Sequence, residues 1–214
     1  VVSAGTERML VEFAAKSPIG KARSRPDLAR QIMDKVRREG LLTTMQAVES
    51  RLDQPVALGY SSAGVIVAVG DGLQGFRVGD RVACAGGGHA VHAEFVTVPQ
   101  NLLAHLPDGL DLDQAAFATL GSIALHGLRL AEPQVGEQVA VIGLGLLGLL
   151  AAALSRASGC TVFGIDLDEA RVARARQLGF AAGARPAALE QGASITSGRG
   201  FDIVLICADT PSSD

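Results

Sequence analysis

The chain has 214 residues, of which 48% are hydrophobic and 19% are charged, and its formal net charge is −3. This composition is typical of a globular protein with one large or two small domains, and it excludes an intrinsically disordered chain. The slightly acidic balance excludes an overall nucleic-acid-binding surface.

The cysteines and the two ends of the chain indicate the cellular location of the protein and the extent of the sequence. Cys84, Cys160 and Cys207 are far apart and form no C-x-x-C pair, so we expect neither a disulfide framework nor a thiolate zinc site. No signal peptide is recognisable, and we expect a cytoplasmic, reducing location. The chain starts at Val1 and stops at Asp214 soon after an apolar run, so we expect both ends to be cut from a longer protein.

Residues 16–52 are expected to form a helical hairpin. Pro26 and Asp27 suit the first turn of a helix that ends at Gly40, and a second helix follows from about Thr43 to Leu52. Both helices are too short to be stable alone, so they must pack on another element.

The same region is strongly basic. Residues 16–38 hold eight Lys and Arg against two Asp. One interpretation is a solvated helix face. The other is a lid that attracts a substrate bearing a phosphate or carboxylate group. The sequence leaves both open.

Residues 56–106 alternate short β-rich runs with turns. The runs cover 63–70, 80–84 and 93–98, and glycine-containing turns separate them. This pattern predicts a small antiparallel barrel or curled sheet. Residues 112–131 then read as helical.

The most informative stretch follows at 138–166. An apolar, β-branched run ends at Gly143, and Gly143, Gly145 and Gly148 have the G-x-G-x-x-G spacing. This is the dinucleotide-binding fingerprint between a predicted strand and a predicted helix. Gly143 permits the tight turn, Gly145 lets the backbone approach the pyrophosphate, and Gly148 allows close helix packing. The phosphates would lie at the helix N-terminus, beside Leu146 and Leu147.

Asp166 closes the next apolar run and indicates which dinucleotide binds. A carboxylate there accepts hydrogen bonds from the ribose hydroxyls and repels a 2′-phosphate, so NAD is favoured over NADP. Arg171 and Arg174 could attract such a phosphate, and a solvated role suits Arg174 better than Arg171.

Two other interpretations of this stretch were weighed. Residues 138–155 carry no charge and approach the length of a transmembrane helix, but three glycines and a β-branched start favour a strand that turns into a buried helix. A strand–helix–strand unit without a nucleotide is the other possibility. Dinucleotide binding is the stronger hypothesis.

The remaining C-terminal elements complete a parallel sheet. Strands are expected at 138–142, 161–166 and 201–207, with a short strand at 180–184. Helices are expected at 145–158, 169–178 and 187–195. Alternating strands and helices indicate a parallel sheet. These four strands are fewer than the usual six of such a domain, so we expect this domain to be truncated.

The order of motifs resembles the medium-chain dehydrogenases/reductases, the zinc alcohol dehydrogenase-like enzymes. Those motifs are Gly59-Tyr-Ser-Ser-Ala-Gly-Val65, Val78-Gly-Asp-Arg-Val82, His92-Ala-Glu-Phe-Val-Thr-Val-Pro99 and the glycine fingerprint. The opening residues and the hairpin look more narrowly like bacterial two-domain oxidoreductases in which such a dehydrogenase is fused to a glucose-fructose oxidoreductase-like domain.

The resemblance implies an α/β architecture in two domains. A partial GroES-like β-barrel catalytic domain would cover 1–112, with the helical hairpin inserted at about 16–52. A partial, doubly wound Rossmann domain would cover 113–214. Thr119, Ser122 and Ala208 are expected near the cofactor, and a homodimer is one assembly that the resemblance allows.

The chain departs from the zinc-dependent members at their metal ligands. They have a Cys where this chain reads Ser3-Ala4 and a His-Glu pair where it reads Tyr60-Ser61. A further Cys expected near Leu120–Ser122 and the cysteine-rich structural-zinc loop are also missing. Cys84, His89 and His92 are close in sequence, but core or surface roles suit them better. Catalytic zinc needs about three converging side chains, so we predict no zinc.

Without zinc, another group must serve as the acid. Tyr60 is the single tyrosine of the chain, and its phenol could donate to a substrate carbonyl with Ser61 assisting. Alternatively, Tyr60 fills the emptied pocket. His126 follows the expected cleft-lining stretch, but packing on its helix suits it better.

We therefore expect a zinc-independent NAD(H)-linked oxidoreductase acting on an alcohol/carbonyl pair of a small molecule, such as a sugar derivative. No nucleic-acid or membrane partner is expected. A zinc-free quinone or enoyl reductase and an inactive nucleotide-binding scaffold are the competing hypotheses. The sequence leaves the substrate, the reaction direction and the oligomeric state open.

Overall fold

A four-stranded parallel sheet organises the C-terminal part of the computed structural model. The structure describes Val2, residues 4–16, Asp34, Arg37, Gly40 and residues 57–185 and 187–208. The chain divides into two units, one of residues 1–62 with 85–103 and the other of residues 63–84 with 104–214. The parallel sheet belongs to the second unit.

The sheet has the strand order β6-β5-β4-β7. Its strands are β4 (Gln138–Ile142), β5 (Thr161–Asp166), β6 (Ala181–Ala184) and β7 (Ile203–Ile206). β4 pairs in parallel with β5 and β7, and β5 pairs in parallel with β6. The strands predicted at 138–142 and 161–166 are confirmed at both ends, and the other two are shorter than predicted. This order places the ends of β4 and β5 side by side.

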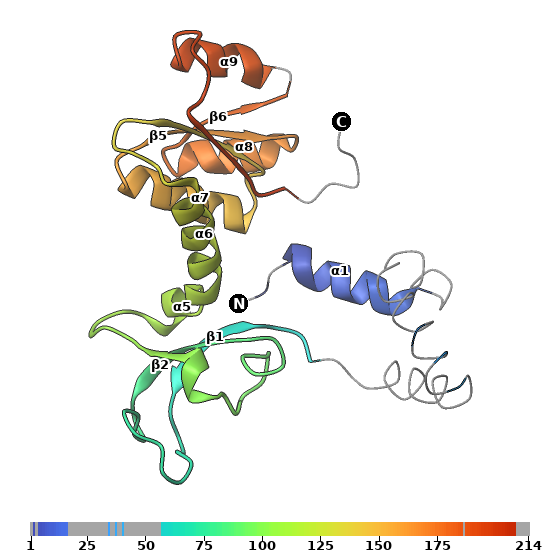
Figure 1. Cartoon of the computed structure of the whole chain (residues 1–214), viewed down its shortest axis with the longest axis vertical. Helices are drawn as coiled ribbons and strands as arrows, with labels where there is room; N and C mark the ends of the chain where they lie inside the picture. The colour runs from blue at the N-terminus through green and yellow to red at the C-terminus, as the bar shows by residue number, and fades with distance from the viewer. Residues whose placement is uncertain are drawn as a thin grey trace. The chain divides into compact units, whose positions relative to one another are not determined.

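Three helices cover the sheet. α7 (Leu146–Ala157) and α8 (Glu169–Gln177) lie on one face, and α9 (Ala187–Ile195) lies on the other (Figure 1). The Asp168 carboxylate caps α8 by accepting a hydrogen bond of 2.8 Å from the Ala170 N–H. All three predicted helices are confirmed to within one residue at each end.

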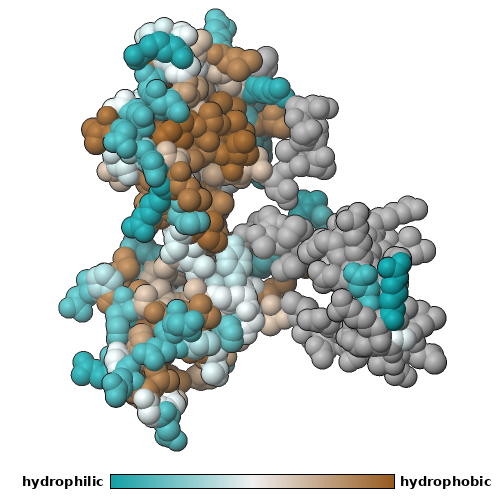
Figure 2. All heavy atoms as spheres, viewed as in Figure 1, coloured by the Kyte–Doolittle hydropathy of each residue, from teal (hydrophilic) through white to brown (hydrophobic). Residues whose placement is uncertain are grey.

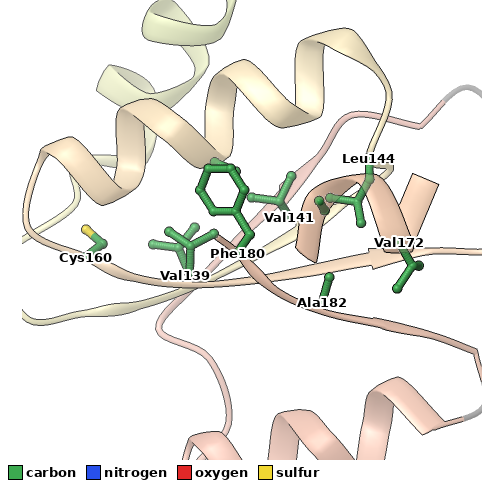
Figure 3. Packing of buried hydrophobic residues seen from close by; sticks show 10 residues of the cluster. Val139, Val141, Leu144, Cys160, Val172, Phe180 and Ala182 are labelled. Carbon is green, nitrogen blue, oxygen red and sulfur yellow. The ribbon is translucent and has the colours of Figure 1, made fainter. Parts of the chain in front are cut away.

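The core fills the space between the sheet and the pair α7 and α8. Val139 and Val141 on the central strand are fully buried, and Leu144, Val172 and Phe180 close over them (Figure 3). Burying a side chain of this size stabilises the fold by about 1.5–3 kcal/mol. On the other face, Phe163 stacks with Phe201 at a ring-centroid distance of 6.0 Å. The alternation along β4 and β5 therefore supplies both faces of the sheet with apolar side chains.

The helical stretch predicted at 112–131 is two helices. α5 (Leu112–Ala115) begins at Asp111, whose carboxylate accepts a hydrogen bond from the Asp113 N–H, and α6 (Ala118–Ala131) follows. Leu120, Ala124 and Leu128 are the buried residues of α6, and their spacing places them on one stripe of the helix.

A three-stranded sheet has the order β1-β2-β3, with β1 (Ser61–Val65), β2 (Arg81–Ala85) and β3 (Leu103–His105). A single-turn 3-10 helix, η1 (Gln100–Leu102), leads into β3. Such a short sheet agrees with the curled sheet expected for the middle of the chain.

The Val78–Val82 motif forms the tight connection before β2. The Ile66 N–H donates to the Asp80 carbonyl, while the Gly79 N–H donates to the Ile66 carbonyl, so two residues oppose one. Gly79 has φ +94°, the conformation that a bulge of this type requires. The Asp80 carboxylate accepts from the Arg77 backbone N–H at 2.9 Å, and this bond is the main reason that the pKa of Asp80 lies below its ordinary value.

Three expectations differ from the structure or lie outside it. The β-rich run at 93–98 is not a strand; Phe95 is 70% exposed, and no described strand pairs with this run. The prediction failed because the alternating pattern cannot supply the ladder partner that a strand needs. Helix α1 (Ala4–Ala15) was not predicted. The two hairpin helices and most of the basic run lie outside the described residues.

Among the described residues, no helix is long and apolar enough to cross a membrane. The hypothesis of a transmembrane segment at 138–155 is therefore wrong for this structure, because a strand and a 12-residue helix share that stretch.

The open edge of the parallel sheet is hydrophobic. On edge strand β7, Val204 and Ile206 are 52% and 74% exposed. Figure 2 shows hydrophobic surface gathered over the part of the molecule that holds this sheet. Unpaired backbone groups and apolar side chains therefore coincide at this edge.

Two helical glycines provide a test of the packing. A Cβ added at Gly148 in α7 would overlap the Gly143 carbonyl oxygen, whereas a Cβ added at Gly127 in α6 would meet nothing within 4 Å. We expect Gly148→Ala to lower the free energy of unfolding by about 1–3 kcal/mol, and Gly127→Ala to raise it by about 0.5–1 kcal/mol. Urea unfolding followed by circular dichroism measures both. Equal effects would contradict the close helix–strand contact.

Candidate functional site

The glycine-rich turn between β4 and α7 adopts the geometry that the fingerprint predicts. Gly143 has φ +94°, and a Cβ there would lie 2.7 Å from the Ala208 nitrogen. Gly148 packs directly against the Gly143 carbonyl oxygen. Gly145 has open space on the side where a side chain would stand. Two of the glycines are thus required by packing, and the third leaves the backbone accessible.

The start of α7 is suited to an anion. Gly145 is the N-cap, so Leu146 and Leu147 occupy the first helical positions. The first intrahelical bond of this turn runs from the Leu149 N–H to the Gly145 carbonyl, which leaves the preceding N–H groups directed outward. No acidic residue lies in the first turn. This end of the helix can therefore receive a phosphate without charge repulsion.

Asp166 lies beside this turn at the end of β5. One carboxylate oxygen accepts a hydrogen bond of 2.7 Å from the Leu144 N–H, and the other accepts one of 2.9 Å from the Asp168 N–H. The residue is 8% exposed. The carboxylate thereby ties the glycine turn to the neighbouring strand, a contact that the sequence pattern did not reveal.

The charge of Asp166 is stabilised despite its burial. Burial has the largest effect and opposes ionisation, but the N–H groups of Asp168 and Leu144 and the charge of Arg171 outweigh it and hold the pKa below its ordinary value. The Arg171 guanidinium lies 3.6 Å from Asp166 and 3.8 Å from Asp168. The structure therefore brings Arg171 to the carboxylate, while Arg174 contacts Gln177 on an exposed face.

The other residues expected near the cofactor differ in whether they contact the glycine turn. Ala208 follows β7, and its backbone lies against Gly143. The Thr119 hydroxyl donates to the Cys84 carbonyl at 3.4 Å, and the Ser122 hydroxyl donates back to Ala118 of its own helix. His126 is exposed on α6. Of this group, the structure brings Ala208 to the glycine turn.

Tyr60 and Ser61 belong to the first unit, at the entry to β1. Tyr60 is partly buried, its backbone carbonyl accepts a hydrogen bond of 3.0 Å from the Gly86 N–H, and its phenol has no hydrogen-bond partner among the described residues. Ser61 is 2% exposed. The phenol is thus available to a ligand, and the serine lies in the interior.

A second polar pair of the first unit was missed by sequence reasoning. The His92 Nε2 lies 3.0 Å from a carboxylate oxygen of Glu7, although 85 positions separate the two residues. Glu7 is 8% exposed. The sequence offers one indication of this pair: His92 occupies an aromatic-type position in the motif at residues 92–99. No pattern indicated its partner.

The resemblance implies that Ser3-Ala4 and Tyr60-Ser61 stand where zinc-dependent members have Cys and His-Glu. Among the described residues, no group of three or more His, Cys, Asp or Glu side chains converges in a way that could hold a metal ion. Burial, with the charge of Glu137, raises the pKa of Cys160, and burial raises that of Cys207. Neither thiol is poised as a thiolate.

The known proteins that this chain resembles include dehydrogenases. Residues 33–108 match the family model of the alcohol dehydrogenase GroES-like domain. Sorbitol dehydrogenase of Halalkalibacterium halodurans is 31% identical over 186 residues, which are 72% of this chain and 54% of that protein.

Several solved structures have a similar fold and more than 25% identity, and two of them are a butanediol dehydrogenase and a quinone oxidoreductase. The crystal structure of 2R,3R-butanediol dehydrogenase from Bacillus subtilis has a TM-score of 0.64 at 28% identity, covering 73% of this chain and 53% of that one. Quinone oxidoreductase from Pseudomonas syringae has a TM-score of 0.58 at 28% identity, covering 70% and 48%. The chain spans about half the length of the curated relatives it matches.

The Asp166 contacts predict a pH dependence of stability. Because the folded pKa is lowered, the unfolded chain takes up the proton first as the pH falls. The contribution of Asp166 is therefore complete above the ordinary carboxyl pKa of about 3.9 and is lost as the pH falls through the lowered folded value.

We expect Asp166→Asn to lower the free energy of unfolding by about 1–3 kcal/mol at neutral pH, because a buried N–H loses its charged acceptor. The deficit should shrink as the pH falls from about 3.9 to about 3, because the parent begins to lose the contribution of the same interaction in this range. Asp168→Asn is the matched control, since asparagine caps a helix as well as aspartate does. Chemical unfolding at both pH values measures the difference. A deficit independent of pH would contradict the assignment.

Proposed function

We propose that the chain is a member of the medium-chain dehydrogenase/reductase superfamily and an NAD(H)-dependent oxidoreductase that interconverts a hydroxyl group and a carbonyl. When bound, the nicotinamide cofactor supplies the hydride acceptor or donor. The observation that carries the proposal is the glycine turn at the carboxyl end of β4 with the Asp166 carboxylate beside it at the end of β5. Ligands of parallel sheets bind at this edge.

The residues of this edge fit a dinucleotide. The open side of Gly145 admits a pyrophosphate, and the N-terminal turn of α7 at Leu146, Leu147 and Gly148 offers N–H donors. Asp166 Oδ1, which accepts one hydrogen bond from the Asp168 N–H, is the proposed acceptor for a ribose hydroxyl. Ala208 and Thr119 complete the proposed cofactor contacts.

The charge of Asp166 favours NAD over NADP. A 2′-phosphate beside an ionised, partly buried carboxylate would be repelled, and Arg171 is already engaged with that carboxylate. The proposed preference for NAD over NADP therefore depends on the side chain of Asp166.

For the substrate we propose a polyol or a sugar derivative. The relatives named above include a sorbitol dehydrogenase and a butanediol dehydrogenase, which supports a substrate rich in hydroxyl groups. The basic run at 16–38 supports a substrate with an anionic group. Tyr60 is the proposed hydrogen-bond donor to the substrate oxygen, with Ser61 assisting, since its phenol has no partner among the described residues.

We further propose that the reaction needs no zinc. The support is the donor set: alanine, tyrosine and serine occupy the positions that match zinc ligands, and none of these side chains is an ordinary zinc ligand. The same observation favours a second candidate, a zinc-free reductase of activated carbon–carbon double bonds. The likeness to a quinone oxidoreductase supports that candidate.

The domain boundary, location and assembly are proposed on less direct grounds. We place the boundary between the catalytic and Rossmann domains near residue 112, supported by the family match that ends at residue 108. A cytoplasmic location is proposed because Cys84, Cys160 and Cys207 are far apart in the sequence and form no C-x-x-C pair. A homodimer is the proposed assembly.

Nucleotide titration tests the cofactor assignment. We expect the protein to bind NADH more tightly than NADPH, measured by the fluorescence of the reduced nicotinamide, since the chain has no tryptophan. Asp166→Ala should weaken NADH binding about 10- to 100-fold, because a charge-assisted hydrogen bond is lost, and should narrow the preference over NADPH. Asp168→Asn should bind like the parent. Unchanged affinity of Asp166→Ala for both nucleotides would sink the assignment.

Metal analysis tests the zinc proposal. The purified protein, prepared without chelator, should contain far less than one zinc per chain, and its turnover should survive prolonged dialysis against a chelator. One zinc per chain that is needed for turnover would overturn the proposal. Substrate screening should include polyols, sugars and an activated enone, since reduction of the enone alone would favour the second candidate.

A further inference from the structure

We propose that His92 is the proton-transfer group of this active site, held in one tautomer by the buried carboxylate of Glu7. This inference rests on the proposed oxidoreductase function and assigns a role in it to the pair formed by His92 and Glu7. It begins with an asymmetry: the Glu7 side chain is 10% exposed, whereas the His92 side chain is 36% exposed. A buried carboxylate behind a partly exposed imidazole is an arrangement suited to acid–base chemistry.

The contact fixes which nitrogen carries the proton. An ionised carboxylate only accepts hydrogen bonds, so at 3.0 Å the neutral imidazole must donate from Nε2. The lone pair of a neutral imidazole then lies on Nδ1. Nδ1 has no hydrogen-bond partner among the described residues, and it is therefore ready to accept a proton.

The ring lies against the turn that precedes β1. A Cβ added at Gly59 would approach the His92 Nδ1 and Cε1 to 3.1 Å, and the His92 N–H donates to the Leu58 carbonyl at 2.8 Å. Gly59 directly precedes Tyr60, the proposed donor to the substrate. The same turn thus carries the phenol and supports the imidazole, within one unit of the structure.

Among the described residues, the Glu7 carboxylate is the charged group that contacts the His92 imidazole. On α1, Arg8 and Glu12 pair with each other at 2.7 Å, and among the described residues the Glu7 carboxylate is the ionised group within hydrogen-bond distance of the imidazole.

The proton balance is simple. Oxidation of a hydroxyl group breaks one C–H and one O–H bond; the nicotinamide cofactor, when bound, would supply the hydride acceptor, and Nδ1 of His92 takes the proton. The products are the carbonyl compound, the reduced cofactor and the imidazolium, which then loses its proton to solvent. Carbonyl reduction follows the same path in reverse.

His92→Gln separates a chemical role from a structural one. The glutamine amide can still donate to Glu7 and so preserve the link between α1 and the loop, but it offers no basic nitrogen. In the full chain we expect its kcat to fall about 100-fold or more, with KM changed less than about threefold. The acidic limb of the pH profile for alcohol oxidation should also disappear. His89→Gln, in the neighbouring glycine-rich loop, is the matched control.

A second readout needs no turnover. Nitrogen NMR of the four histidines should show His92 protonated at Nε2 and unprotonated at Nδ1 at neutral pH, the signals being assigned by their loss in His92→Gln. Glu7→Gln should relax this tautomer preference and lower kcat. An Nδ1–H tautomer in the parent would overturn the inference.

The outcomes distinguish this inference from the proposed function. A parent with turnover whose His92→Gln variant keeps the parental kcat and pH profile would overturn the proton-transfer role alone. A parent that binds NADH but turns over no substrate of the panel would overturn both. Loss of turnover in His92→Gln, with unchanged NADH binding and a folded circular dichroism spectrum, supports the role.

Discussion

The close contact between Gly148 and the Gly143 carbonyl is the constraint on which the second unit depends. A side chain at Gly148 would overlap that oxygen, so the absence of a Cβ decides how near α7 can begin to the end of β4. This nearness places the helix N-terminus at the carboxyl edge of the sheet, beside the end of β5. The glycine-rich turn, the neighbouring Asp166 and the packing of α7 over Val139 and Val141 all follow from it.

Much of the second unit could be predicted because its signals are local. The β-branched run before Gly143, the apolar helix after it and the capping aspartate Asp168 each act within a few residues, and the predicted bounds of β4 and β5 match the structure. The interruption between α5 and α6 was less visible, since residues 112–131 have the composition of one continuous helix. The chemical role of each glycine could be inferred from spacing alone because the turn geometry leaves few alternatives.

The first unit was harder because its contacts are distant in sequence. An alternating run such as 93–98 has the pattern of a strand, but a strand exists only where another strand pairs with it. The hydrogen bond between Glu7 and His92 joins residues 85 positions apart, and the motif that contains His92 gives no indication of Glu7 as its partner. Helix α1 was likewise not expected. By the resemblance, other residues stand at the usual zinc-ligand positions. Only the fold can show which side chains could act there instead.

The bond between Asp166 and the Leu144 N–H has a consequence for the energetics of ligand capture. Because the carboxylate fixes the glycine turn as the chain folds, the nucleotide proposed above would meet a surface whose backbone entropy has already been lost. Association then orders few protein groups, and most of the contact energy is retained as affinity. The structural cost of recognition is paid once, when the chain folds, and each binding event proceeds on a preorganised cradle.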